Sequence, residues 1–158
     1  MLTSIRALHA RAVHLLRKIE WTGPLLVRLT LGIFFAFDGW GKLHHLDDVV
    51  IPYFKELNIP APGFQATMVS VIEFGGGLLL IAGLGTRIVS ALLIGVMAAA
   101  IWTAKLPDIH GVYDLVATDE FAYLVMFVWL VVSGAGAVSV DHLLARRVLT
   151  EPRVGVAP

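Results

Sequence analysis

Residues 66–84 read ATMVSVIEFGGGLLLIAGL, an apolar run interrupted by one carboxylate, Glu73, and by the glycines Gly75, Gly76 and Gly77. A helix of about 20 mostly apolar residues matches the thickness of a bilayer core. An acid near the middle of such a helix costs at least a few kcal/mol if it faces lipid, so it is expected to face other helices. Glycines let a neighbouring helix approach closely. We therefore interpret this stretch as the polar, tightly packed centre of a small membrane protein.

The composition of the whole chain agrees with this interpretation. The 158 residues are 58% hydrophobic and 15% charged, with a mean hydropathy of +0.82, whereas an ordinary soluble domain is about a quarter charged. The formal net charge is zero, which gives no indication of nucleic acid binding. The absence of cysteine excludes disulfides and cysteine-ligated iron–sulfur clusters.

Three other apolar runs have a similar length, so the predicted fold class is an all-α integral membrane four-helix bundle. The spans are expected at about residues 23–41, 66–84, 88–104 and 121–138. The turn at residues 85–87 is so short that the second and third spans should form an antiparallel hairpin. Polar connections, residues 42–63 and 105–120, join the other spans. The first connection should contain a short helix at residues 53–57 and end in the proline-rich segment 59–63.

The two ends of the chain are basic and flank a predicted four-helix domain at residues 23–144. Residues 1–22 are expected either to lie in the membrane interface as an amphipathic helix or to form a solvated basic tail, and residues 145–158 form a second basic tail. Cytoplasmic segments carry an excess of lysine and arginine. The tails and the short turn contain eight such residues against three in the two long connections. Both termini are therefore predicted to be cytoplasmic.

This topology brings polar residues together at two levels of the bundle. In the outer half we expect Asp38, Lys42, Glu73, Lys105 and Glu120 to converge, because Lys42 lies one turn beyond Asp38 on the same helix face and the other spans place their polar residues at a similar depth. Trp40 and Trp102 should lie near the mouth of this site. Some of these residues also have simpler interpretations, because Asp38 and Lys42 could form a local ion pair, Lys105 could reach the headgroups and the tryptophans could anchor the interface. At the inner side Arg28, Arg87 and Asp141 are expected to hold helix ends together as structural polar residues.

Metal and haem binding are not predicted. His44, His45 and His110, with neighbouring aspartates, are acceptable metal ligands by type, but adjacent histidines do not share one helix face, and hydrated loop histidines are the preferred interpretation. All six histidines fall in tails or connections, so a haem held at bundle depth is not expected either.

Four blocks of the sequence, taken in order, resemble the DoxX family of small four-helix membrane proteins. They are RLTLGIFF running into DGWGKL at residues 28–43, LNIPAP at residues 57–62, EFGGG with GLGTR at residues 73–87, and SGAGAVSVD at residues 133–141. The resemblance covers about residues 25–144. The last block has Gly-Ala-Gly where the family pattern has Gly-Pro-Gly.

The resemblance implies a bundle in the bacterial or archaeal inner membrane and a link with quinones, since the related DoxD protein is a subunit of a thiosulfate:quinone oxidoreductase. Other members are associated with redox stress and with detoxification of quinones or catechols. It also implies that five polar residues belong to the family pattern, namely Arg28, Lys42, Glu73, Glu120 and Asp141. The fold alone does not imply redox chemistry.

The leading functional hypothesis is a quinone-interacting membrane subunit of an oxidoreductase or redox-stress system. In this hypothesis the proton-exchanging, catalytic residues are Glu73, Asp38 and Glu120, and the substrate-binding residues are Lys42, Trp40, Trp102 and Lys105. Quinone is the expected ligand, and the expected partners are the lipid bilayer, a redox partner protein and a second copy of the chain. The alternatives are a non-enzymatic scaffold or assembly factor, and a carrier of small solutes or metal ions.

Overall fold

The computed structural model describes residue 6 and residues 13–150, and within these ranges it contains helices and loops but no strand. Residues 13–19 are helical. The elements that follow are α2 (Thr22–His44), the π-helical turn η1 (Leu46–Val50), α3 (Ile51–Glu56), α4 (Pro62–Ala82), α5 (Thr86–Ala100), the π-helical turn η2 (Ile101–Lys105), the 3₁₀ turn η3 (Leu106–Asp108), α6 (Val112–Val116), α7 (Asp119–Ser133) and α8 (Val140–Thr150).

Three of these helices are long and apolar enough to cross a membrane. They are α2, α4 and the continuous helix Thr86–Asp108, which contains α5, η2 and η3. These helices confirm the predicted all-helical class and the first three predicted spans. The helix at the predicted fourth span, α7, has only 15 residues. At 1.5 Å per residue its length is about 22 Å, which is shorter than a bilayer core of about 30 Å. The fourth crossing and the complete four-span bundle therefore stay predictions.

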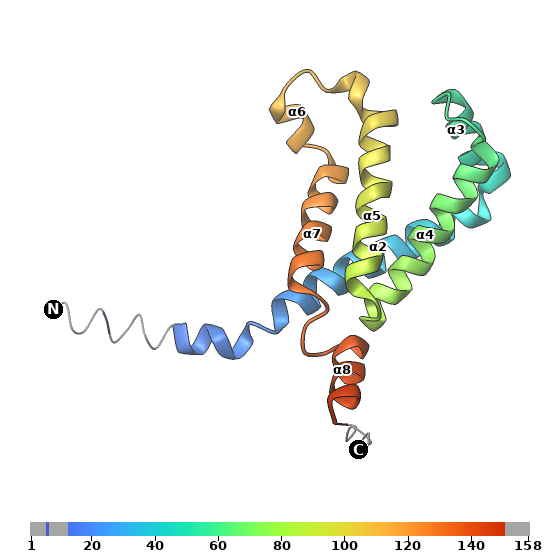
Figure 1. Cartoon of the computed structure of the whole chain (residues 1–158). Coiled ribbons are helices and arrows are strands. Elements are labelled where there is room, and N and C mark those ends of the chain that lie inside the picture. Colours follow the sequence, from blue (N-terminus) through green and yellow to red (C-terminus); the bar gives the residue numbers. More distant parts are fainter. Residues whose placement is uncertain (1–5, 7–12, 151–158) are drawn as a thin grey trace, which may run out of the picture.

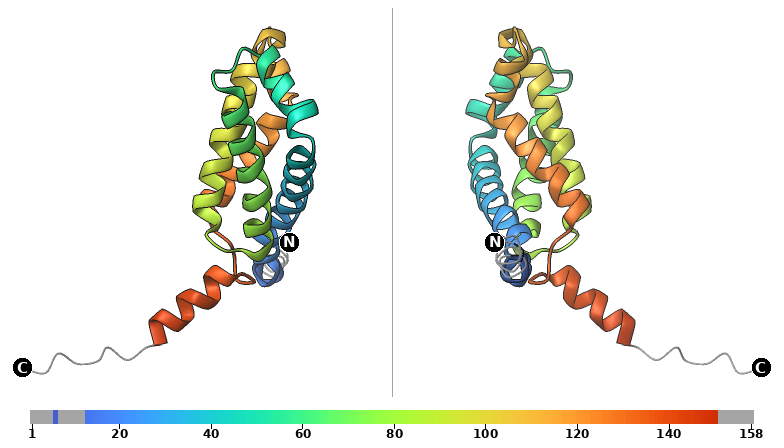
Figure 2. Two further views of the ribbon diagram at one scale, coloured as in Figure 1. Left: turned by 90° about the vertical axis from the view of Figure 1, so that its right-hand side faces the viewer. Right: turned by 90° about the vertical axis from the view of Figure 1, so that its left-hand side faces the viewer.

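The long helices lie side by side in two closely packed pairs, α2 with α4 and α5 with α7 (Figures 1 and 2). The short turn from α4 to α5 makes the predicted antiparallel hairpin and links the two pairs. The core between them contains fully buried apolar side chains, among them Leu31, Phe35, Leu80, Leu93 and Phe127. Many other large apolar side chains are exposed on the outside of the bundle, as expected of a surface that faces lipid.

Glycine makes the close contact between α2 and α4. A Cβ atom built on Gly77 of α4 would overlap the backbone nitrogen of Ala36, and one on Gly39 of α2 would overlap the backbone nitrogen of Phe74. All three glycines after Glu73 were predicted to have this role, but only Gly77 meets a neighbouring backbone. A Cβ atom on Gly76 would meet side chains of α5, the nearest being Val89 at 3.3 Å, and Gly75 has open space beside it.

Different short helices lie at the two ends of the bundle. The helical segment 13–19 and α8 lie at one end, while α3 and α6 lie at the other (Figure 2). At the first end, α7 stops at Ser133 because Gly134 and Gly136 both have positive φ angles, 76° and 78°. The predicted fourth span, which continued to residue 138, is thus too long by five residues at its end.

The predicted basic tails fall partly outside the described residues, which exclude residues 1–5, 7–12 and 151–158. Within the part that the structure describes, Leu15, Leu16 and Ile19 are exposed. Exposed leucine and isoleucine beside basic residues are typical of an interfacial helix, and this role stays a prediction.

Candidate functional site

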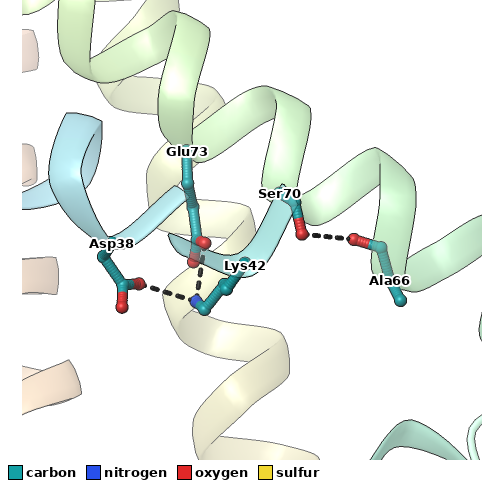
Figure 3. Close-up of polar contacts among 5 residues, drawn as sticks. All are labelled: Asp38, Lys42, Ala66, Ser70 and Glu73. Atoms are coloured by element: carbon teal, nitrogen blue, oxygen red, sulfur yellow. Dashed lines mark hydrogen bonds and ion pairs between the residues drawn. The ribbon is translucent and has the colours of Figure 1, made fainter. Parts of the chain in front are cut away.

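Close packing of α2 on α4 brings Lys42 to Glu73. Gly39 lies one turn before Lys42 and lets the two backbones touch beside Ser70 and Phe74. The Ser70 hydroxyl donates a hydrogen bond to the Ala66 carbonyl, 2.8 Å away on its own helix (Figure 3). Because the Ser70 hydroxyl is used within α4, Glu73, one turn further along α4, takes its partner from α2.

Lys42 contacts two carboxylates at once. Its Nζ lies 2.6 Å from Oε2 of Glu73 and 2.8 Å from Oδ2 of Asp38 (Figure 3). The Glu73 side chain is 2% exposed, whereas Lys42 and Asp38 are 32% and 39% exposed. A buried acid with a partner on a neighbouring helix was predicted from the sequence, and Glu73 has this geometry. Removing one member of such a pair leaves an uncompensated buried charge.

Lys42 and Glu73 line a cavity of about 770 Å³. A second ion pair lies on the same cavity wall, with Lys105 Nζ 3.4 Å from Oε1 of Glu120. The rest of the lining is mostly apolar, with the aromatic residues Tyr53, Phe54 and Trp102. The volume falls within the range of about 300–1,000 Å³ that is usual for small-molecule sites.

The two π-helical turns border this cavity. Val49 and Val50 of η1 and four consecutive residues of η2, 102–105, contribute to its lining. A π-helical turn adds a residue to the helical repeat and redirects the side chains that follow, and such turns are frequent at functional sites. In this protein they occur where the ends of α2 and α5 open around the polar residues.

Five of the predicted site residues share the cavity, and two do not line it. Lys42, Glu73, Trp102, Lys105 and Glu120 line it, whereas Asp38 reaches it only through Lys42. Trp40 packs against His44 and Phe74, with ring centroids 4.1 and 5.2 Å apart, and is half exposed.

The first connection supplies cavity residues that the sequence analysis did not name. Tyr53 and Phe54 come from α3, Asn58 and Pro60 from the loop that follows, and Gln65 from the first turn of α4. The short helix at 53–57 was predicted, and α3 confirms it. No periodic pattern indicated which face of the bundle this connection would cover.

The connection histidines have local contacts outside the cavity. Nδ1 of His44 lies 2.9 Å from the carbonyl oxygen of Trp40, and Nδ1 of His45 lies 3.2 Å from Oδ2 of Asp48. The His45 contact lowers the pKa of the exposed Asp48 carboxyl.

At the opposite end, the predicted structural residues hold loops to helix ends. Arg28 is buried and donates to the carbonyls of Ala135, at 2.8 Å, and Val138, at 2.7 Å. The Asp141 carboxylate accepts hydrogen bonds from the backbone nitrogens of Gly85 and Thr86, at 2.7 and 3.0 Å, at the start of α5.

Arg87 completes this group. Its guanidinium donates to the Val132 carbonyl at 3.3 Å, close to the end of α7. Together these contacts connect α2, α5, α7, the loop after α7 and the first turn of α8.

The helices define a class, that of small multi-pass helical membrane proteins, and a cavity lined by charged residues lies between them. The DoxX family model matches residues 23–106, and the chain belongs to the DoxX family. The protein is accordingly placed in the bacterial or archaeal inner membrane.

Three curated relatives have similar lengths. The chain is 29% identical to "Inner membrane protein YqjF" of Escherichia coli over 84% of this chain and 99% of that protein. It is 31% identical to "Putative oxidoreductase CatD" of Bacillus subtilis over 75% of this chain and 84% of that protein. It is 29% identical to an uncharacterized membrane protein of Mycobacterium tuberculosis over 83% of this chain and 88% of that protein. No solved structure matches the chain significantly.

Proposed function

We propose that the protein binds a quinone or quinol in the cavity beside Lys42 and Glu73 and acts as the quinone-interacting membrane subunit of a redox system. The observation that carries this proposal is the ion pair between Lys42 and the buried Glu73 on the wall of a mostly apolar cavity of about 770 Å³. An apolar cavity with a few fixed polar groups is the usual form of a small-molecule site. The name of the Bacillus subtilis relative, an oxidoreductase, supports a redox association.

The polar groups suit the two chemical needs of a quinone. Its ring carbonyls accept hydrogen bonds, and the Lys42 ammonium is a donor in the cavity wall. Reduction of a quinone to a quinol consumes two electrons and two protons, which become the two hydroxyl hydrogens. Glu73 and Glu120 both line the cavity and are the proposed proton carriers, and Asp38 holds Lys42 from its other side.

The electrons are proposed to pass between the ring and a redox partner protein. In the proposed topology the chain crosses the membrane four times with both ends in the cytoplasm, so that the cavity lies in the outer half of the bilayer. A quinone would then enter from the lipid phase, where its isoprenoid tail stays.

Binding of a short-chain benzoquinone to the protein in lipid nanodiscs tests this proposal, with empty nanodiscs as the background. The informative variant combines Lys42→Met with Glu73→Gln, because it removes the ion pair without leaving a lone buried charge. The matched control combines Lys55→Met with Glu56→Gln on α3, two exposed residues that do not line the cavity.

We expect saturable binding by the wild type and by the control, and affinity weakened at least about tenfold in the Lys42/Glu73 variant, since hydrogen bonds to charged groups contribute about 1.5–3 kcal/mol. Wild-type uptake equal to that of empty nanodiscs would exclude a quinone site. Unchanged binding in a folded Lys42/Glu73 variant would exclude this cavity and favour a scaffold role for its polar residues.

A further inference from the structure

Glu120 has an acceptor that the protein leaves unused. Its Oε1 lies 3.4 Å from Lys105 Nζ, while its Oε2 is buried and has no hydrogen-bond partner. Nearly all buried polar atoms in folded proteins have a partner, so each exception requires an explanation. Glu120 lines the cavity through the exposed part of its side chain, which is 21% exposed, so a bound molecule can supply the missing donor once the side chain turns Oε2 toward the cavity.

The position of Glu120 in its helix does not explain the unused oxygen. A carboxylate in the first turn of a helix often accepts a hydrogen bond from a free backbone N–H. At the start of α7 the hydroxyl of the N-cap residue Thr118 already accepts the hydrogen bond from the Phe121 nitrogen, at 3.3 Å. Glu120 is thus held at the cavity wall without serving as the cap of its own helix.

A carboxylate oxygen that needs a donor distinguishes the two redox forms of a quinone. The oxidised ring has carbonyl oxygens, which accept hydrogen bonds and cannot donate them. The reduced ring has two hydroxyls, and each can donate. A site that offers a buried acceptor binds a ligand hydroxyl and disfavours the analogue that lacks it, because the site's own polar group would stay unpaired.

We infer that the cavity binds the reduced, hydroxyl-bearing quinol in preference to the quinone, with Oε2 of Glu120 accepting a hydrogen bond from one ring hydroxyl. This inference rests on the proposed function, since it assigns the preferred redox form and a specificity-determining residue to the same cavity. Lys105 pairs with the other oxygen of Glu120, which leaves Oε2 as the acceptor for the ligand.

The experiment compares two ligands of one ring, a short-chain benzoquinol kept reduced under anaerobic conditions and the corresponding quinone, on the protein in nanodiscs. The variant is Glu120→Gln, whose amide can either accept from a hydroxyl or donate to a carbonyl. The matched control is Asp119→Asn, the adjacent exposed carboxylate that does not line the cavity.

We expect the wild type and Asp119→Asn to bind the quinol about tenfold more tightly than the quinone, and Glu120→Gln to bind the two forms within about threefold of each other. Equal wild-type affinities for the two forms, both lost in the Lys42/Glu73 double variant, would overturn this inference and leave the proposed function standing. A quinol preference that persists in Glu120→Gln would overturn the assignment to Glu120. Failure of both ligands to bind any form of the protein would overturn the proposed function and this inference together.

Discussion

Lys42 is the residue through which α2 neutralises the buried acid of α4. Its ammonium lies between an exposed carboxylate, Asp38, and a buried one, Glu73. The Asp38 side chain is 39% exposed and the Glu73 side chain is 2% exposed, so only Glu73 would remain as a buried charge without its partner. The two carboxylates should therefore respond differently when the ammonium is removed.

Lys42→Met is predicted to destabilise the protein by about 3 kcal/mol, because it leaves Glu73 buried without its counter-charge. Adding Glu73→Gln to this variant should recover most of the loss, while Asp38→Asn alone should cost less than about 1 kcal/mol, as expected for a partly exposed pair. Denaturant unfolding in detergent, analysed as a double-mutant cycle, measures the coupling. Additive effects of the Lys42 and Glu73 substitutions would contradict the predicted coupling.

The charged residues of the site could be predicted from the sequence more completely than the other residues that line the cavity. A spacing of four residues places Asp38 beside Lys42 on one helix face, and the depth of Glu73 in an apolar run required a partner from another helix. The direction of Trp40 could not be predicted, since an aromatic residue next to a glycine-rich contact can pack on either side of it. Tyr53 was missed because the short helix predicted at residues 53–57 has no pattern that indicates which face it turns toward the bundle, and Gln65 was missed because it precedes the apolar run 66–84.

Among the contacts between helices, that of α2 with α4 brings Lys42 to Glu73 and so positions the site. Gly77→Ala is predicted to destabilise the protein by about 2 kcal/mol or more, because its Cβ would overlap the Ala36 backbone and lie 2.7 Å from the Gly32 carbonyl oxygen. Gly75→Ala, two residues away in open space, is the matched control and should leave stability unchanged or slightly raised. Unfolding midpoints in one detergent compare the two, and equal losses would contradict the close contact.

The start of α5 depends on a residue more than fifty positions away in the chain. Asp141→Ala removes both acceptors from the Gly85 and Thr86 nitrogens and is predicted to cost about 1–2 kcal/mol, as for other helix caps. Asp141→Asn keeps one acceptor oxygen and should cost less. The same unfolding measurement checks this order, and an alanine variant as stable as the wild type would contradict it.

Element boundaries followed from the sequence where an apolar run ends in a turn signal. The proline-rich segment 59–63 predicted the start of α4, and the short turn at residues 85–87 predicted the α4–α5 hairpin. The end of α7 was misplaced because the run continues past Ser133 as Gly-Ala-Gly-Ala-Val, which is apolar in composition although both of its glycines take positive φ angles.

At the scale of the whole molecule, the number of membrane crossings decides on which side the cavity lies. The cysteine-free chain allows single cysteines to be placed at His110, between η3 and α6, and at the exposed Ala145 of α8. A membrane-impermeant maleimide applied to intact cells should label the cysteine at position 110, and should label the one at position 145 only after permeabilisation. Labelling of both positions from the same side would show that α7 does not cross.

The most direct test of the central claim is photoaffinity labelling by a photoreactive short-chain quinone, with the labelled residues mapped by mass spectrometry. The account predicts that the label attaches to cavity residues such as Tyr53 and Trp102, that excess unlabelled quinol competes for it, and that it disappears in the combined Lys42→Met and Glu73→Gln variant. Label spread over the lipid-facing surfaces of the helices, unaffected by competitor or variant, would contradict it.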